Sequence, residues 1–211
     1  MFINRKDAGV QLAKALEKYR DKGVVVLGIP RGGTETAFYV ADYLHAKFSL
    51  IFSKKLGHPH NPELAIGAVA EDGSIFINEY AKEYFSQQLI MLQAEEKKKE
   101  IQERIQKLRY GEPLPEIKGK TIIIVDDGIA TGATIFASIK LCKNKGAGKI
   151  IVAAPIGSKE IEKKKKKESD EVIILEKPLF YQAVSQGYQF FHDLTNEETI
   201  AFLTRWKKEK H

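Results

Sequence analysis

The chain has 211 residues, enough for one α/β domain with a sizeable buried core, and its 34 basic and 28 acidic residues give a formal net charge of +6. Its single cysteine, Cys142, excludes an intrachain disulfide and a cysteine-rich metal site. No apolar run approaches the ~20 residues that cross a bilayer, and the amino-terminal segment lacks the apolar stretch of a secretory signal, so we expect no membrane partner and a cytoplasmic location. The positive charge suits phosphate ligands and nucleic acid equally.

The first half of the chain alternates between helical and strand patterns. Apolar residues at helical spacing predict helices over 7–20, 34–44 and 78–109, and short apolar runs predict strands over 24–29, 48–52 and 66–70. Residues 53–63 have no regular pattern and are expected to form a loop. Along the last of these helices we expect i,i+4 ion pairs, namely Glu95 with Lys99, Glu100 with Arg104 and Glu103 with Lys107.

The second half continues the alternation. Strands are predicted over 121–125, 149–154 and 172–175, a helix over 132–143, and a final helix toward Trp206 that opens with a capping box at Thr195 and Glu198. Residues 178–193 are aromatic-rich and irregular. Alternating strands and helices predict an α/β fold with a mainly parallel open sheet flanked by helices.

Residues 122–134, with the sequence IIIVDDGIATGAT, carry the most informative pattern. Four apolar residues form a buried strand, and open α/β sheets bind ligands at the carboxyl ends of their strands. Asp126 and Asp127 follow at that edge, where they can accept hydrogen bonds from a sugar diol or lie near a Mg²⁺ held by phosphates. Gly128 permits a tight turn, and residues 130–134 offer small side chains and backbone N–H groups at a helix N-terminus. A ribose 5-phosphate would satisfy both parts.

This stretch resembles the thirteen-residue signature with which type I phosphoribosyltransferases bind 5-phosphoribosyl 1-diphosphate (PRPP). It is not a P-loop, because no lysine follows a final glycine. The alternative is an ordinary strand with an Asp-Asp-Gly turn and a threonine-rich helix cap, but capping alone rarely produces adjacent aspartates before such a loop. The resemblance implies the type I phosphoribosyltransferase fold and transfer of phosphoribose between diphosphate and an acceptor, with Mg²⁺ as cofactor. The PRPP-binding residues it implies are Arg31, Gly32, Gly33, Asp126, Asp127, Gly128, Ala130, Thr131, Gly132, Ala133 and Thr134.

Two further segments fit the layout of that family. Residues 29–33 (IPRGG), called here the diphosphate loop, follow the first strand, where Arg31 could bind phosphate oxygens with two hydrogen bonds and where the family often has a cis peptide. On their own these residues are more typical of a plain turn, and it is their place beside the signature that favours the diphosphate loop. Residues 53–63 lie where the family carries a mobile catalytic loop, and either Lys54 or Lys55 could supply its cation. The expected catalytic residues are therefore Lys54, Lys55, Arg31 and Asp127, and no protein side chain is expected to bind Mg²⁺ unless Asp126 and Asp127 assist.

The carboxyl-terminal part carries the remaining expectations. Similarity to a group of uncharacterised bacterial phosphoribosyltransferases extends over most of the chain and implies no particular acceptor. It implies one domain over 1–211, with a core at about 1–154 and a carboxyl-terminal hood at about 155–211 that covers a small nitrogenous acceptor. The hood aromatics, which could stack on the acceptor or form a core, are Phe180, Tyr181, Tyr188, Phe190 and Phe191. The family commonly forms homodimers.

A different class of function stays open. The protein could keep the PRPP pocket as a sensor and regulate nucleotide-metabolism genes by binding RNA or DNA. We expect no nucleic-acid partner, because no nucleic-acid-binding module is recognisable in the sequence. The presence of the expected catalytic residues Arg31, Lys54 and Lys55 favours the enzyme.

Overall fold

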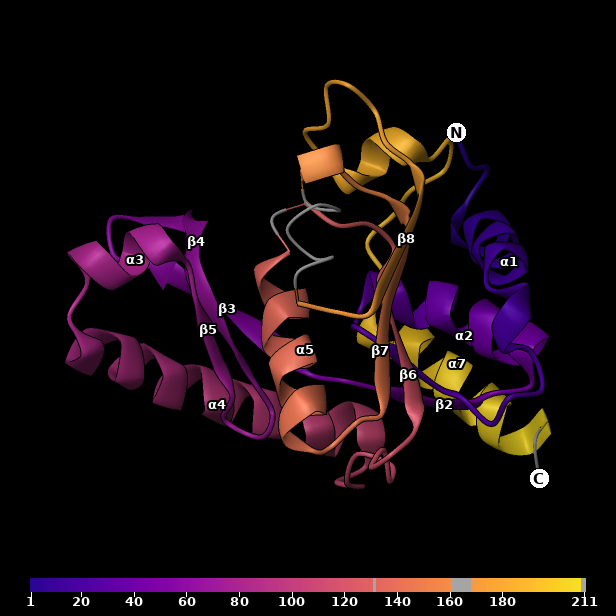
Figure 1. The fold of residues 1–211 in the computed structure, drawn as a ribbon, viewed down its shortest axis with the longest axis horizontal. Coiled ribbons are helices and arrows are strands. Elements are labelled where there is room, and N and C mark those ends of the chain that lie inside the picture. Colours follow the sequence, from indigo (N-terminus) through magenta and orange to yellow (C-terminus); the bar gives the residue numbers. More distant parts are fainter. Residues whose placement is uncertain (131, 161–167, 210–211) are drawn as a thin grey trace.

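A five-stranded parallel sheet forms the body of the protein in the computed structural model (Figure 1). The structure describes residues 1–130, 132–160 and 168–209, and of residues 62 and 63 only the backbone. The strand order is β2-β1-β6-β7-β8. The bounds are β1 (Val25–Gly28), β2 (Lys47–Leu50), β6 (Thr121–Val125), β7 (Lys149–Ile156) and β8 (Glu171–Glu176). The predicted mainly parallel sheet is confirmed.

Helices cover both faces of this sheet. Its central strands are therefore buried on both sides, and their sequences are continuous apolar runs. Alternate residues of β6 point to opposite sides. Ile123 and Val125 pack with α1 (Arg5–Ala15) and α2 (Gly32–Leu44), whereas Ile122 and Ile124 pack with α5 (Ala133–Asn144). The short 3-10 helix η1 (Glu17–Tyr19) follows α1. The last helix, α7 (Asn196–Glu209), lies beside α2, where the rings of Trp206 and Phe38 are 5.7 Å apart.

The capping box predicted for the last helix is confirmed. The Thr195 hydroxyl accepts the Glu198 N–H at 3.1 Å, and the Glu198 carboxylate accepts the Thr195 N–H at 2.8 Å. No helix in the described part of the chain combines the length and the hydrophobicity that a membrane crossing requires.

A second lobe projects from one side of the sheet (Figure 1). It contains an antiparallel sheet of β3 (Ser53–His58), β4 (Asn61–Ala70) and β5 (Ile75–Ile77), followed by α3 (Glu79–Tyr84) and α4 (Gln87–Arg109). The prediction of a loop over 53–63 is therefore wrong. Residues of β3 pair with β4 from Ser53 opposite Ala70 to His58 opposite Asn61, and these backbone hydrogen bonds outweigh the weak strand preference of a polar sequence.

The predicted helix over 78–109 is in fact two helices. Phe85 and Ser86 are extended, and the Ser86 hydroxyl caps the next helix by accepting the Leu89 N–H at 3.3 Å. The ion pairs along α4 also differ from those predicted. Glu95 pairs with Lys98, not with Lys99. Glu100 pairs with Lys97 and with Lys54 of β3, and these two lysines take the place of the expected partner Arg104.

The segment after β8 lies across the carboxyl end of the main sheet, next to the amino terminus (Figure 1). It contains the 3-10 helix η2 (Val184–Gly187). The Phe2 N–H donates to the Gly187 carbonyl at 2.7 Å, and the Phe2 carbonyl accepts the Gln189 N–H at 2.8 Å. A small apolar cluster of Phe2, Ala8, Ile156 and Tyr188 fixes this cover over the end of β7.

Candidate active site

The diphosphate loop and the two signature aspartates form one continuous surface. The Ile29 N–H donates to the Val125 carbonyl at 2.9 Å, which joins the ends of β1 and β6. A Cβ placed on Gly32 would lie 1.9 Å from Oδ2 of Asp127, and one placed on Gly33 would lie 2.9 Å from Oδ1 of Asp126. Both glycines are therefore required by close approach to the carboxylates.

Gly32→Ala is expected to destabilise the protein by about 1–3 kcal/mol, the usual cost of overpacking, and to displace the Asp127 carboxylate. Gly157→Ala is the matched control, since its Cβ would lie 3.1 Å from the end of the flexible Ile174 side chain and otherwise in ordinary contact with Ile129 at 3.5 Å. Urea denaturation of the two variants measures the difference. Equal midpoints would show that the loop and Asp127 are not tightly packed.

The diphosphate loop leads directly into the first turn of α2. The peptide bond between Pro30 and Arg31 is cis, and the Arg31 side chain is exposed. Gly32 and Gly33 occupy the first turn of α2, where N–H groups have no partner within the helix. An anion held there would meet these amides and the positive end of the helix.

The two aspartates have different electrostatic surroundings. Nε of Arg5 donates to Oδ2 of Asp127 at 2.7 Å, with the two side chains only 4% and 12% exposed. Nη1 of Arg5 also donates to the His192 carbonyl at 2.7 Å, and the guanidinium lies 4.1 Å from the centre of the Phe191 ring. Arg5 thus supplies the cation that compensates the Asp127 carboxylate in this buried pair.

Asp126 is half-buried and has no ion pair among the residues that the structure describes. Its Oδ1 accepts the Asp127 N–H at 2.9 Å. Withdrawal from water, and next the negative charge of Asp127, raise the pKa of Asp126 well above its usual range. A hydroxyl donor from a ligand would relieve this unfavourable state, so Asp126 is the better placed of the two to receive a new hydrogen bond.

The rest of the signature forms a turn that leads into α5. Gly128 packs against the η2 segment, because a Cβ there would lie 2.5 Å from the Val184 side chain. Gly132 caps α5 with a φ of 72°, which favours glycine. Ala130 is exposed, Ala133 is buried and Thr134 is half-buried. The predicted residue Thr131 lies outside the described residues. Ser53, which the sequence analysis did not single out, donates its hydroxyl to the Thr134 carbonyl at 3.1 Å.

Lys54 and Lys55 point to opposite faces of β3, as neighbours on a strand must. Lys54 pairs with Glu100 of α4. Lys55 is exposed and lies opposite Ala68 in the register, on the other face of the hairpin. The structure thus separates the two candidate cations and brings only Lys54 to α4.

The predicted hood aromatics divide into two groups. Phe180 and Phe190 are exposed, whereas Tyr188 is buried and donates its hydroxyl to the Asp127 carbonyl. The Tyr181 hydroxyl is buried without a hydrogen-bond partner among the described residues. Burial, and then the charges of Asp127 and Asp126, raise the pKa of Tyr181. Its neutral hydroxyl therefore remains a donor close to both carboxylates.

Residues 5–190 match the family described as the phosphoribosyl transferase domain. The chain belongs to this family. The resemblance found in residues 122–134 is thereby confirmed, and the solved relatives support the type I fold.

Known relatives extend the match along the chain. Two Mycobacterium tuberculosis proteins, each named "Putative phosphoribosyl transferase", are 41% identical over 97% of this chain, which spans only 47% of their own length. The crystal structure of TT1426 from Thermus thermophilus has a TM-score of 0.84 and 35% identity, covering 97% of this chain and 98% of that one. A transcriptional regulator of Methanosphaera stadtmanae is 43% identical over 58 residues, which are 28% of this chain and 27% of that protein.

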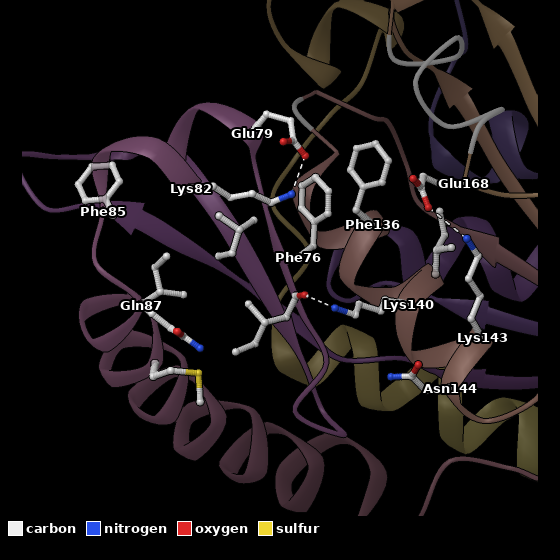
Figure 2. Close-up of a pocket in the computed structure, with 15 residues that line it drawn as sticks. Phe76, Glu79, Lys82, Phe85, Gln87, Phe136, Lys140, Lys143, Asn144 and Glu168 are labelled. Carbon is white, nitrogen blue, oxygen red and sulfur yellow. Dashed lines mark hydrogen bonds and ion pairs between the residues drawn. The ribbon is translucent and has the colours of Figure 1, made fainter.

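One sizeable cavity of this phosphoribosyl transferase domain lies away from the signature. It measures about 790 Å³, opens between β5, α3, α4 and the outer side of α5, and contains the stacked rings of Phe76 and Phe136 (Figure 2). The lysines around it are already engaged: Lys82 with Glu79, Lys140 with the Ile75 carbonyl, and Lys143 with Glu168. None of the predicted site residues that the structure describes lines this cavity.

Arg5 of α1 could not be identified from the sequence, and Ser53 was included only as the first residue of the range 53–63. Tyr181 and Tyr188 were predicted as hood aromatics, but the hydrogen bond from the Tyr188 hydroxyl to the Asp127 carbonyl was not predicted. Folding brings Arg5 and Tyr188 to Asp127 at the end of β6. No local pattern distinguishes Arg5 from a surface residue of an amphipathic helix. Gly32 and Gly33 were predicted from the resemblance, and their packing against the aspartates shows why glycine is needed at both positions.

Proposed function

We propose that this domain transfers phosphoribose from PRPP to a small nitrogenous base, or catalyses the reverse reaction. The observation that carries the proposal is the packing of Gly32 and Gly33 against Asp127 and Asp126, beside the N-terminus of α5. This arrangement offers hydroxyl acceptors between two groups of backbone donors, which matches a ribose with a phosphate at one end and a diphosphate at the other.

Each end of PRPP has a proposed set of residues. Asp126 and Asp127 would accept hydrogen bonds from the ribose hydroxyls, and residues 128–134 would bind the 5-phosphate through backbone N–H groups. The amides of Gly32 and Gly33, with the Arg31 guanidinium, would bind the diphosphate. Of the two candidate lysines, we propose Lys54, because it lies among the other cations of α4.

The proposed reaction breaks the bond between C1 of ribose and a diphosphate oxygen and forms a bond from C1 to the acceptor nitrogen, which loses its proton. Positive charge develops on the ribose ring and negative charge on the departing diphosphate. Donors at Arg31, Lys54 and the loop amides would stabilise that negative charge. The protein needs no nucleophile, since positioning of the two reactants supplies much of the rate.

Mg²⁺ is the proposed cofactor, as phosphoribosyl transferases generally use it. Within the described residues no cluster of three His, Cys, Asp or Glu side chains that could hold a metal ion occurs. The adjacent carboxylates of Asp126 and Asp127 suit a metal that arrives on the substrate and retains water and phosphate ligands. Such an ion would neutralise charge on the leaving group.

The acceptor would lie under the proposed carboxyl-terminal hood. The Tyr181 hydroxyl, buried near both aspartates without a partner, supports this placement, since a ligand with a hydrogen-bond acceptor would satisfy it. Exposed Phe180 could stack on a planar ring. Homodimer formation is a further proposal, to be tested by sedimentation velocity.

The test is release of diphosphate from PRPP and Mg²⁺ across a panel of nucleobases and related nitrogen heterocycles, with direct detection of the nucleotide product. We expect release that depends on one acceptor. If PRPP neither binds in calorimetry nor turns over with any acceptor, the proposal is wrong.

A regulatory function is the second candidate, and the short match to a transcriptional regulator favours keeping it. Arg31 is exposed and has no ion pair in the part of the chain that the structure describes, which favours the enzyme, because a sensor has no leaving group to stabilise. Salt-dependent retention of RNA or DNA together with PRPP binding and no turnover would support the regulator instead.

A further inference from the structure

Two lysines of different elements, Lys54 of β3 and Lys97 of α4, share one carboxylate, that of Glu100. Glu100 of α4 accepts hydrogen bonds from Nζ of Lys54 and, at 2.5 Å, from Nζ of Lys97, and the three side chains are 28–33% exposed. These bonds, the one from Lys54 first, lower the pKa of Glu100, so it is a carboxylate at neutral pH. One negative charge thus serves two lysines.

Arg104, one turn further along α4, lacks such a partner. It is half-buried, and within the described residues it makes neither an ion pair nor a hydrogen bond, although the i,i+4 spacing predicts a pair with Glu100. Burial, and next the charge of Arg31, lower the pKa of Arg104. The positive charges of Arg31 and Arg104 therefore repel each other. An anion bound between them would replace this repulsion with attraction to both.

The cluster adjoins the proposed diphosphate site through the backbone. The Ile51 N–H donates to the Gly28 carbonyl at 3.0 Å, at the end of the strand that leads into the diphosphate loop. Two residues later the Ser53 hydroxyl donates to the Thr134 carbonyl, in the segment predicted to bind the 5-phosphate. Residues 51–53, which precede Lys54, are thus hydrogen-bonded both to the strand before the diphosphate loop and to the signature. We call Arg31, Lys54, Lys97 and Arg104 the cation cluster.

We propose that Lys97 and Arg104 of α4 bind the diphosphate of PRPP together with Arg31 and Lys54, and that Glu100 is an internal counter-anion which the diphosphate displaces from Lys54. Four cations against one carboxylate leave a surplus that matches a multiply charged anion. No covalent step is involved. The inference rests on the proposed function and adds to it the helix that contacts the leaving group.

Arg104→Met tests the proposal, because methionine keeps much of the length and apolar character of arginine while removing the charge. We expect affinity for PRPP and for inorganic diphosphate, each with Mg²⁺, to fall about 10- to 100-fold, as for loss of one hydrogen bond to a charged group. Affinity for ribose 5-phosphate, which lacks the diphosphate, should be unchanged. Lys98→Met is the control, since Lys98 pairs with Glu95 on the exposed side of the same helix. Circular dichroism establishes that both variants are folded.

Glu100→Gln separates a counter-anion from a merely structural residue. Removing the negative charge should tighten binding of inorganic diphosphate severalfold, because Lys54 no longer has to leave a carboxylate. Weaker diphosphate binding by a folded Glu100→Gln protein would overturn the counter-anion role.

The outcomes also separate this inference from the proposed function. If the unaltered protein binds PRPP and Arg104→Met binds it equally well, the role of α4 is wrong and the proposed function stands. If the unaltered protein binds neither PRPP nor inorganic diphosphate, both are overturned.

Discussion

Asp126→Asn is expected to lower affinity for ribose 5-phosphate about 10- to 100-fold, because a hydrogen bond between a hydroxyl and a carboxylate contributes more than one to a neutral amide. In Asp126→Asn/Asp127→Asn, PRPP binding should be lost by a larger factor. Isothermal calorimetry with Mg²⁺ measures both. Asp42→Asn, at an exposed position of α2, is the control. Unchanged affinity in the double variant would remove the proposed ribose role.

The same substitution should leave stability unchanged or increase it. The raised pKa of Asp126 means that folding disfavours its charged form. In the unaltered protein this group therefore costs stability as pH rises from the ordinary aspartate pKa, about 4, through the higher value in the folded state. Asp126→Asn cannot titrate, so its unfolding free energy should fall less over that range. Urea denaturation at a series of pH values would reveal the difference, and identical pH profiles would contradict the electrostatic argument.

Arg5→Met is expected to cost about 3–5 kcal/mol of stability, because it leaves the Asp127 carboxylate buried without its cation. Arg20→Met is the matched control: Arg20 is 39% exposed, its nearest carboxylate oxygens are 3.7 and 3.8 Å away, and such surface pairs contribute about 0–1 kcal/mol. Denaturant unfolding measures both variants.

A second variant tests the reason for the effect. If the unpaired charge causes the loss, Arg5→Met/Asp127→Asn should recover part of the stability that Arg5→Met loses, because asparagine is neutral. A double variant whose losses simply add would indicate that Arg5 stabilises the protein through Phe191 and the His192 carbonyl instead.

The main sheet could be predicted because its strands are buried on both faces, which imposes apolar runs such as residues 122–125. The signature could be predicted because its chemistry is local: two acids and a helix N-terminus lie within thirteen residues. The predicted residues at 32–33 and 126–127 do come together, which follows from the adjacency of β1 and β6 in the sheet.

The β3–β4 hairpin could not be predicted, because its polar residues gain their partners only from backbone pairing with β4. Arg5 is 122 positions from Asp127, and no pattern in the sequence joins them. Arg104 was predicted to pair with Glu100, since helical spacing allows it, but Lys54 arrives from another element and takes that carboxylate. In each case a long-range contact decided between local alternatives.

The hairpin also bears on how fast this protein could recruit its ligand. Lys54 belongs to a strand whose backbone is already ordered by cross-strand hydrogen bonds. Binding of an anion would therefore not carry the entropy cost of ordering a flexible loop. What remains is a change of partner by one flexible, partly exposed side chain. Association limited by diffusion and accelerated at low ionic strength would then be the natural kinetic signature of this lobe.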